Sequence, residues 1–434
     1  MQQNHTKLNY GRTFFIGLAF LSISAFWQVY DNIIPLILQN TFHMGETLTG
    51  GVMAMDNVLA IFLLPVFGSL SDKVDTPFGK RMPFIVGGTG LAVIFALLLP
   101  VADRRESQVL FITALFCTLI AMGLYRSPAV ALMPDLTPNR LRSRANAVIN
   151  LMGAVGGVYS LIMIQLLVGA GDRPDYLPLF ASVTGLMAVA VIILIITIPE
   201  KKLKAQLAPE LEETESAAEE SAAPKAQKTV LSPEVKRSMI FMLLSIFLWY
   251  AAYNAVTTAF SRYTRVVWGM EGGSFANCLM VATVAAIISY IPIGHIASRI
   301  GRKKTIMGGV LLMSACYLAA IFVGQFHPLI NAAFALIGVG WAAINVNSYP
   351  MIVAMSEGAD IGKFTGTYYT FSMAAQIATP ILSGFLLEKV SYRTLFPYAF
   401  VFSMLAFVTM TQVHHGDVKP QKKGSMLENF DVED

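Results

Sequence analysis

The chain is 434 residues long; 55% of its residues are apolar and only 13% are charged. Soluble globular proteins carry roughly 25% charged residues, so this composition excludes an ordinary soluble protein and indicates a membrane protein. The three cysteines, Cys117, Cys278 and Cys316, all fall in apolar stretches. Their odd number excludes a disulfide framework.

Long apolar stretches follow one another along the whole chain. A membrane-spanning helix needs about 20 mostly apolar residues, and twelve such stretches predict an all-α membrane protein with twelve transmembrane helices. The predicted spans cover residues 12–38, 48–70, 83–101, 108–133, 145–168, 177–198, 238–262, 274–297, 305–325, 328–354, 362–387 and 395–413. The first span is too long for a cleaved signal peptide and is expected to stay in the mature protein.

The stretch between the sixth and seventh spans differs in composition from its surroundings. Residues 200–237 are rich in Ala, Glu and Lys, and such a segment buries too little apolar surface to offset its ordering entropy. We therefore expect a flexible cytoplasmic linker there. It joins a six-helix half at 1–199 to a second six-helix half at 238–413, and a cytoplasmic tail follows at 414–434.

The distribution of positive charge predicts the orientation of the chain. Lys and Arg accumulate on cytoplasmic loops, and most of the 31 in this chain fall on the side of the membrane that carries both termini. We expect a multi-pass cell-membrane protein with both termini in the cytoplasm. The net charge of +4 then reflects topology and requires no nucleic-acid partner. Because no nucleophile, metal-ligand cluster or phosphate-binding loop appears, the sequence predicts no enzyme, no cofactor and no metal site.

A charged hairpin occurs once in each half, between the second and third spans of that half. The first copy contains Gly68, Asp72 and Gly79, and the second has Gly294 and Ser298 where the first has Gly68 and Asp72. Both copies end in a glycine followed by basic residues. This pattern resembles the signature loop of the major facilitator superfamily. The resemblance implies two six-helix halves with a substrate site between them near the midplane, operating by alternating access.

The first copy is longer and more specific than the second. It reads Ser-Asp-Lys at 71–73 and Phe-Gly-Lys-Arg-Met-Pro at 78–83, and it is similar to the sucrose:proton symporters and their glycoside-pentoside-hexuronide:cation relatives. The resemblance implies cation-coupled transport of a sugar or glycoside. The fourth span departs from that family, which has an Arg five residues before an Asp-Leu pair. Here Val130 holds that position before Asp135, and Arg126 stands one turn earlier.

The hairpin also has a mechanical interpretation. Asp72 at the end of one helix can pair with Lys80 or Arg81 at the start of the next and hold the cytoplasmic side shut. The alternative is that these charges only fix the topology. The predicted cytoplasmic gate consists of Gly68, Asp72, Gly79, Lys80, Arg81, Asp135, Arg144 and Arg302.

Three ionisable residues lie inside the predicted spans of the first half. Each costs on the order of 3 kcal/mol to insert into a membrane, so each is a functional candidate. Asp31 and Asp56 lie at similar depth, whereas Arg126 lies deeper and need not pair with either carboxylate. A carboxylate in a cavity can bind a proton in one conformation and release it in another, and two carboxylates at one depth could instead coordinate Na⁺. We predict that Asp31 and Asp56 bind the coupling ion, H⁺ or Na⁺; a structural hydrogen-bonding role is the alternative.

Amide and aromatic side chains in the spans are candidates for a substrate site. Amides both donate and accept hydrogen bonds, and beside aromatic faces they suit a polyhydroxyl ligand, although such side chains also serve in packing. The predicted substrate-binding residues are Gln28, Arg126, Tyr253, Asn254, Trp341, Asn345 and Gln376.

Three functions are consistent with the sequence. The first is a monomeric secondary transporter that moves a small polar solute, such as a sugar or glycoside, by H⁺- or Na⁺-coupled symport. The second is an efflux antiporter of the same superfamily for drugs or metabolites. The third is a membrane sensor that binds a ligand without transporting it.

Overall fold

The computed structural model describes residues 8–138, 141–171, 173–208, 232–355 and 361–417. Within these ranges, twelve helices are long and apolar enough to cross a membrane. The first six are α1 (Tyr10–Asn40), α2 (Glu46–Lys73), α3 (Met82–Arg104), α4 (Gln108–Asp135), α5 (Arg142–Leu167) and α6 (Leu177–Thr197). The second six are α8 (Pro233–Trp268), α9 (Ala276–Ile300), α10 (Arg302–Ile321), α11 (Leu329–Met355), α12 (Ile361–Lys389) and α13 (Leu395–Thr411), with the short 3-10 helix η2 (Tyr392–Thr394) before α13. The predicted fold class is confirmed.

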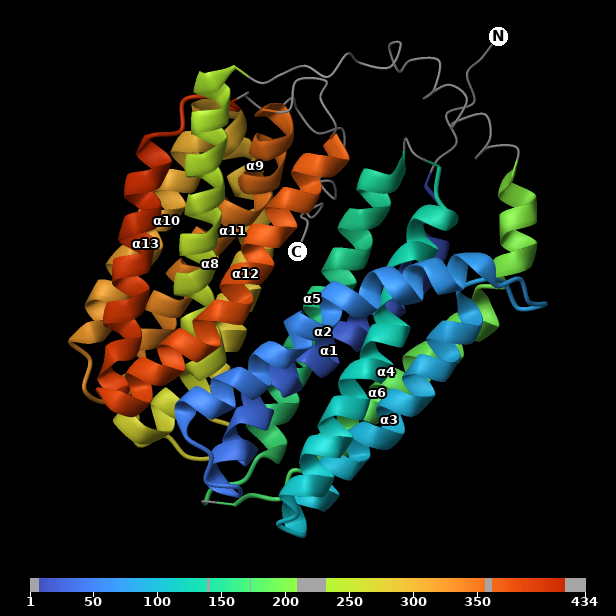
Figure 1. The fold of residues 1–434 in the computed structure, drawn as a ribbon, viewed down its shortest axis with the longest axis horizontal. Helices are drawn as coiled ribbons and strands as arrows, with labels where there is room; N and C mark the ends of the chain where they lie inside the picture. Colours follow the sequence, from blue (N-terminus) through green and yellow to red (C-terminus); the bar gives the residue numbers. More distant parts are fainter. Residues whose placement is uncertain (1–7, 139–140, 172, 209–231, 356–360, 418–434) are drawn as a thin grey trace.

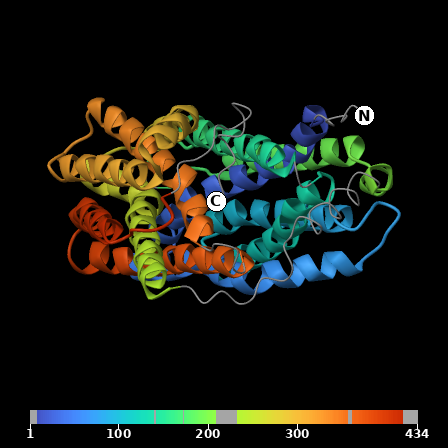
Figure 2. The same cartoon turned by 90° about the horizontal axis from the view of Figure 1, so that it is seen from above.

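The two sets of six helices form two halves that lie side by side, α1–α6 in one and α8–α13 in the other (Figures 1 and 2). Within the first half α1 packs against α5 and α3 against α4, and within the second α9 packs against α11 and α8 against α13. Glycines permit the closest approaches. A Cβ at Gly156 of α5 would collide with the backbone of Leu21 in α1, and one at Gly338 of α11 with the backbone of Ala282 in α9.

Helix α8 is longer than the predicted span 238–262. It has 36 residues, begins at a Ser232 cap whose Oγ accepts from the Val235 N–H, has proline at its first position, and ends at Gly269 in the left-handed conformation. At about 1.5 Å per residue it exceeds the ~30 Å of the bilayer core. The apolar stretch in the sequence therefore corresponds only to the central part of α8.

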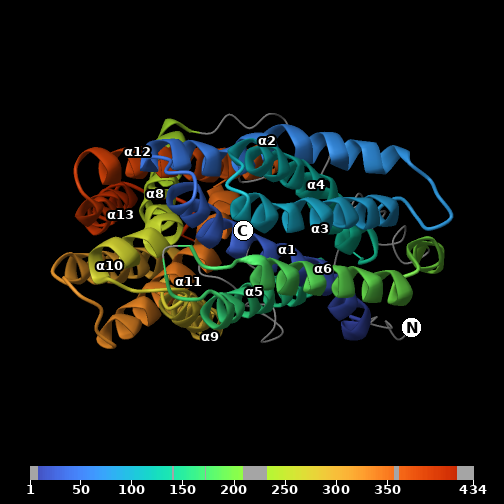
Figure 3. The same ribbon diagram turned by 90° about the horizontal axis from the view of Figure 1, so that it is seen from below.

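The two halves meet at one end of the molecule. There α2 packs against α12, α5 against α9 and α1 against α8 (Figure 3). We call the end that contains residues 72–81 and 298–302 the hairpin face, and the end that contains residues 41–46 and 389–394 the far face. Because successive spans alternate in direction, Tyr10 and Thr411 lie at the hairpin face.

The segments predicted as linker and tail are ordered where the structure describes them. Residues 200–208 form a helix and α8 already begins at Pro233, so both ends of the expected flexible linker 200–237 are helical. In the tail, the backbone N–H of His414 donates to Ser238 Oγ at 3.1 Å. Polar contacts to the helix bundle hold these ends, and composition alone does not reveal such contacts. Residues 209–231 and 418–434 lie outside the described ranges.

Candidate functional site

The two predicted coupling carboxylates lie on neighbouring helices of the first half. Asp31 of α1 and Asp56 of α2 are both half-buried, and they are close enough to interact electrostatically. Asp56 Oδ1 accepts from the backbone and side-chain amides of Asn57 at 2.6 and 2.8 Å. Among the described residues, no hydrogen bond or ion pair reaches the Asp31 carboxylate. The two acids therefore differ in their partners although they share a location.

Arg126 shares a pocket with one of these acids. It lines one small pocket together with Asp56 and Trp27, at the junction of α1, α2 and α4. The long arginine side chain can carry its charge along the helix away from its own Cα, so a difference in depth along the helices is compatible with a shared pocket. The pocket therefore brings an acid and a base together inside the first half.

Gln28 occupies the same helix as Asp31, one turn before Asn32. Its side-chain oxygen accepts from Asn32 Nδ2 at 3.2 Å, and its backbone carbonyl accepts from the same amide at 2.9 Å. Asn32 Oδ1 and Trp27 Nε1 are buried without a hydrogen-bond partner in the described part of the chain. These two atoms of α1 therefore carry hydrogen-bonding capacity that the described residues do not satisfy.

The second half contributes an aromatic group. The rings of Tyr253 on α8 and Trp341 on α11 stack with centroids 3.8 Å apart and planes 3° from parallel, and Tyr250 meets Trp341 edge-on at 5.2 Å. Tyr253 and Trp341 are both predicted substrate-binding residues, and Tyr250 lies three residues before Tyr253 on the same helix, at the helical repeat.

The amide candidates of the second half are less closely grouped. Asn254 Nδ2 on α8 and Asn345 Oδ1 on α11 are buried and have no hydrogen-bond partner among the described residues. Buried polar atoms are normally satisfied, so these two atoms are available to a ligand or water. Gln376 is half-buried on α12, and the described contacts do not join it to the other candidates.

The hairpin of the first half converges on Arg81. Its Nε donates to Asp135 Oδ2 at 2.9 Å and its Nη2 to Asp72 Oδ1 at 2.5 Å, while Nη1 donates to Ser71 Oγ and, at 3.4 Å, to the Gly68 carbonyl. Burial opposes the charge of this guanidinium, but the two carboxylates outweigh that effect and raise its pKa above the ordinary value. All of these groups belong to the first half.

A residue outside the predicted gate completes this network. Glu200, at the start of the 200–208 helix, is 2% exposed. Its two carboxylate oxygens accept the backbone N–H groups of Lys80, Arg81 and Met82 at 2.8 to 3.0 Å. These are the N–H groups at the start of α3, which lack partners within the helix. Gly79, at φ +115°, lies against this carboxylate, where a Cβ would overlap it.

The second hairpin is built differently. Ser298 Oγ donates to the His295 carbonyl at 2.7 Å, and Arg302 Nη1 donates to the Pro350 carbonyl at 3.4 Å. The backbone N–H of Lys303 donates to Asp417 Oδ1 at 3.0 Å, so an acid from the tail caps α10 much as Glu200 caps α3. Arg144, the remaining predicted gate residue, is half-buried in the first turn of α5.

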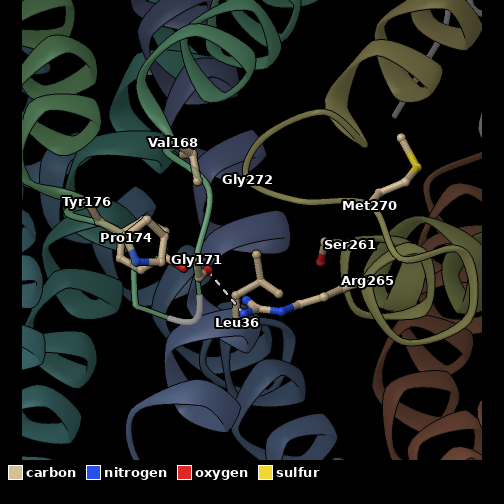
Figure 4. Close-up of a pocket in the computed structure, with 9 residues that line it drawn as sticks. All are labelled: Leu36, Val168, Gly171, Pro174, Tyr176, Ser261, Arg265, Met270 and Gly272. Atoms are coloured by element: carbon tan, nitrogen blue, oxygen red, sulfur yellow. Dashed lines mark hydrogen bonds between the residues drawn. The ribbon is translucent and has the colours of Figure 1, made fainter.

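The structure also places unpredicted groups at the far face, where the halves meet. A pocket there lies between the α5–α6 loop and α8, and Arg265 Nη2 spans it to donate to the Gly171 carbonyl at 3.1 Å (Figure 4). The buried Ser261 hydroxyl lines the same pocket. No group of three or more His, Cys, Asp or Glu side chains suited to a metal ion occurs in the described ranges.

Comparison with known proteins places this architecture in a family. The family model described as Major Facilitator Superfamily matches residues 16–290 and 268–428. The chloramphenicol resistance protein CraA of Acinetobacter baumannii is 27% identical over 218 residues, which cover 48% of this chain and 51% of CraA. An uncharacterized symporter of Synechocystis is 26% identical over 185 residues, which cover 39% of this chain and 32% of that protein. The chain thus spans about half or less of these relatives.

Solved structures show the same fold over nearly the whole chain. A peptide transporter POT has a TM-score of 0.66 at 12% identity, covering 95% of this chain and 96% of its own. The nucleoside transporter NupG has a TM-score of 0.65 at 15% identity, covering 93% and 100%. With the family match spanning both halves, the chain belongs to the Major Facilitator Superfamily.

Proposed function

We propose that the protein is a secondary transporter that moves a small polar solute, such as a sugar or glycoside, by symport with H⁺ or Na⁺. In this proposal it works as a monomer in the cell membrane, with the hairpin face in the cytoplasm and the residues around Arg81 and Arg302 as its cytoplasmic gate. The halves are in contact at the far face, so the conformation described here is closed toward the outside.

The observation that carries the proposal is the arrangement of Asp31 and Asp56. Two carboxylates within electrostatic reach repel each other when both are charged, so binding one cation between or onto them is favourable. Asp56 already has two amide donors from Asn57 and shares a pocket with Arg126. Asp31 has no such support in the described chain. We therefore assign binding and release of the coupling ion chiefly to Asp31, with Asp56 as its electrostatic partner.

The substrate class rests on the second half of the molecule. The stacked Tyr253 and Trp341 present flat apolar surface, and the unpaired amide atoms of Asn254 and Asn345 can accept and donate hydrogen bonds. A sugar ring offers a matching apolar face and a rim of hydroxyl groups. The resemblance of the first hairpin to sucrose and glycoside symporters favours the same class.

Export of drugs is the second candidate function. It is favoured by the match to a chloramphenicol resistance protein over about half of each chain. An exporter with this structure would use the same acids to bind an ion that enters as the drug leaves. The aromatic group would then contact a planar drug instead of a sugar.

Proteoliposomes can test both functions. Radiolabelled sugars, glycosides and chloramphenicol are offered with an imposed pH or Na⁺ gradient of either direction. Asp31→Asn should abolish accumulation against a gradient while exchange of labelled for unlabelled substrate survives, because the amide keeps the size and loses the charge. Asp75→Asn is the matched control, since Asp75 forms an exposed ion pair with Lys201 at 3.0 Å. Full ion-driven accumulation by both Asp31→Asn and Asp56→Asn would refute the coupling role, and movement of chloramphenicol alone would favour export.

A further inference from the structure

At the far face the two halves contact each other through polar side chains, and a buried ion pair joins them. Glu46 in the first turn of α2 is 3% exposed and Arg262 of α8 is 6% exposed. Arg262 Nε donates to both carboxylate oxygens of Glu46, at 2.9 and 3.2 Å, and the Tyr392 hydroxyl of η2 donates to Glu46 Oε1. The acid comes from the first half and both donors come from the second.

A second carboxylate also joins the halves, and here the acid belongs to the second half and the donor to the first. Glu388 near the end of α12 accepts the backbone N–H of Thr47 at 2.9 Å. This N–H belongs to the first turn of α2, which has no partner within its own helix, and the cap residue Gly45 supplies no side-chain hydrogen bond. The start of a helix in the first half is therefore capped by a residue of the second.

The backbones of α2 and α12 touch around these contacts. A Cβ at Gly50 would collide with the backbone of Pro380, and one at Gly384 with the backbone of Glu46. Glycine at both positions lets the two helices approach closely enough for Glu388 to reach the Thr47 N–H. The far face is thus closed by direct backbone contact as well as by charge.

We propose that Glu46, Arg262, Tyr392 and Glu388 form the far-face lock, the gate that must open for the solute to pass between the halves on this side. In the closed state Glu46 and Arg262 are buried, and each needs the other as its partner, whereas Glu388 is exposed and contributes its cap to the start of α2. When the halves separate, water can solvate Glu46 and Arg262 individually, so the open state does not depend on the pair. Neutralising Glu46 therefore penalises only the closed state, because it leaves the Arg262 charge buried without its counter-ion.

The lock can be tested without a substrate or an ion gradient, so the result is independent of the proposed coupling. Ser261 is 2% exposed and lies in the far-face pocket between the halves (Figure 4). In a protein with Cys117, Cys278 and Cys316 replaced by alanine, Ser261→Cys reports opening through its rate of reaction with a water-soluble fluorescent maleimide. Glu46→Gln should raise that rate by about tenfold or more, since the lost pairing shifts the equilibrium toward the open far face.

Two controls separate gating from damage to the fold. Glu106→Gln makes the same chemical change at the far face, but Glu106 pairs with Arg173 inside the first half. In the Glu106→Gln background, the cysteine at position 261 should therefore react with the maleimide at the same rate as in the parent. Ser160→Cys reports on the core of the first half, where Ser160 is fully buried and donates to the Ala25 carbonyl at 2.7 Å. Its rate should not rise with Glu46→Gln. Equal labelling in the Glu46→Gln and Glu106→Gln variants would overturn the proposal, as would a parallel rise at Ser160→Cys.

Discussion

Replacing Arg81 with lysine tests how far the first hairpin depends on the forked shape of one side chain. Arg81 uses different nitrogens for its two acids, Nε for Asp135 and Nη2 for Asp72. A lysine keeps the positive charge but carries all its donors on one nitrogen, so it cannot reproduce both bonds in this geometry. The substitution therefore removes about one charge-assisted hydrogen bond without changing the net charge.

The size of the effect follows from the exposure of the partners. Hydrogen bonds to charged groups contribute ~1.5–3 kcal/mol, but the Asp72 and Asp135 side chains are 58% and 25% exposed, and solvent weakens such pairs. We therefore expect a loss of about 1–2 kcal/mol of folding free energy. For a cooperative unit the size of one half, each kcal/mol lowers the melting temperature by roughly 2–4 °C.

The assay is thermal unfolding of the purified protein in detergent, followed by the circular dichroism of its helices. Arg105→Lys is the control, because Arg105 is an exposed residue at the other end of the same helix α3. We expect Arg81→Lys to melt several degrees lower, by about 2–8 °C, and Arg105→Lys to match the parent. Equal melting temperatures for the two variants would refute the reasoning and reduce Arg81 to a topology signal.

Three further outcomes are expected. Glu200→Gln should lower stability by about 1 kcal/mol, since the start of α3 loses a charged cap, and an unchanged melting curve would show that the cap contributes nothing. Gly156→Ala should lower the free energy of unfolding by ~1–3 kcal/mol because the new methyl group meets backbone. Gly87→Ala, where the methyl group faces open space, should be neutral or slightly stabilising, and similar losses in both variants would contradict this. Trp341→Ala should weaken substrate affinity more than Trp341→Phe, which retains a ring to stack on Tyr253, and equal affinities measured by binding titration would argue against an aromatic substrate platform.

Much of the fold follows from local properties of the chain. Each apolar stretch must satisfy its own backbone hydrogen bonds in lipid, and an α-helix does so within a single segment. For that reason the number and approximate position of the spans could be predicted from composition. Ends were less predictable: α8 extends to Trp268 because a helix may continue beyond the membrane wherever caps and packing allow.

The candidate site was predicted as a set of residue types, without their pairings. Rare charges in apolar spans identified Asp31, Asp56 and Arg126, because the cost of burying a charge makes each one conspicuous. Which of them share a pocket depends on how helices cross and how far a side chain reaches, and only the structure places Arg126 and Asp56 in the lining of one pocket.

The contacts between segments far apart in the chain were decided by the tertiary structure alone. Glu46 and Arg262 lie on either side of the boundary between the halves, and in the sequence each is an ordinary charge near the end of a span. Glu200 stands in a stretch whose composition indicates a linker, yet it caps a helix more than a hundred residues earlier. Composition and periodicity describe a residue and its near neighbours, so they predict helices well. A cap or an ion pair supplied by a distant segment exists only once both segments are folded into place.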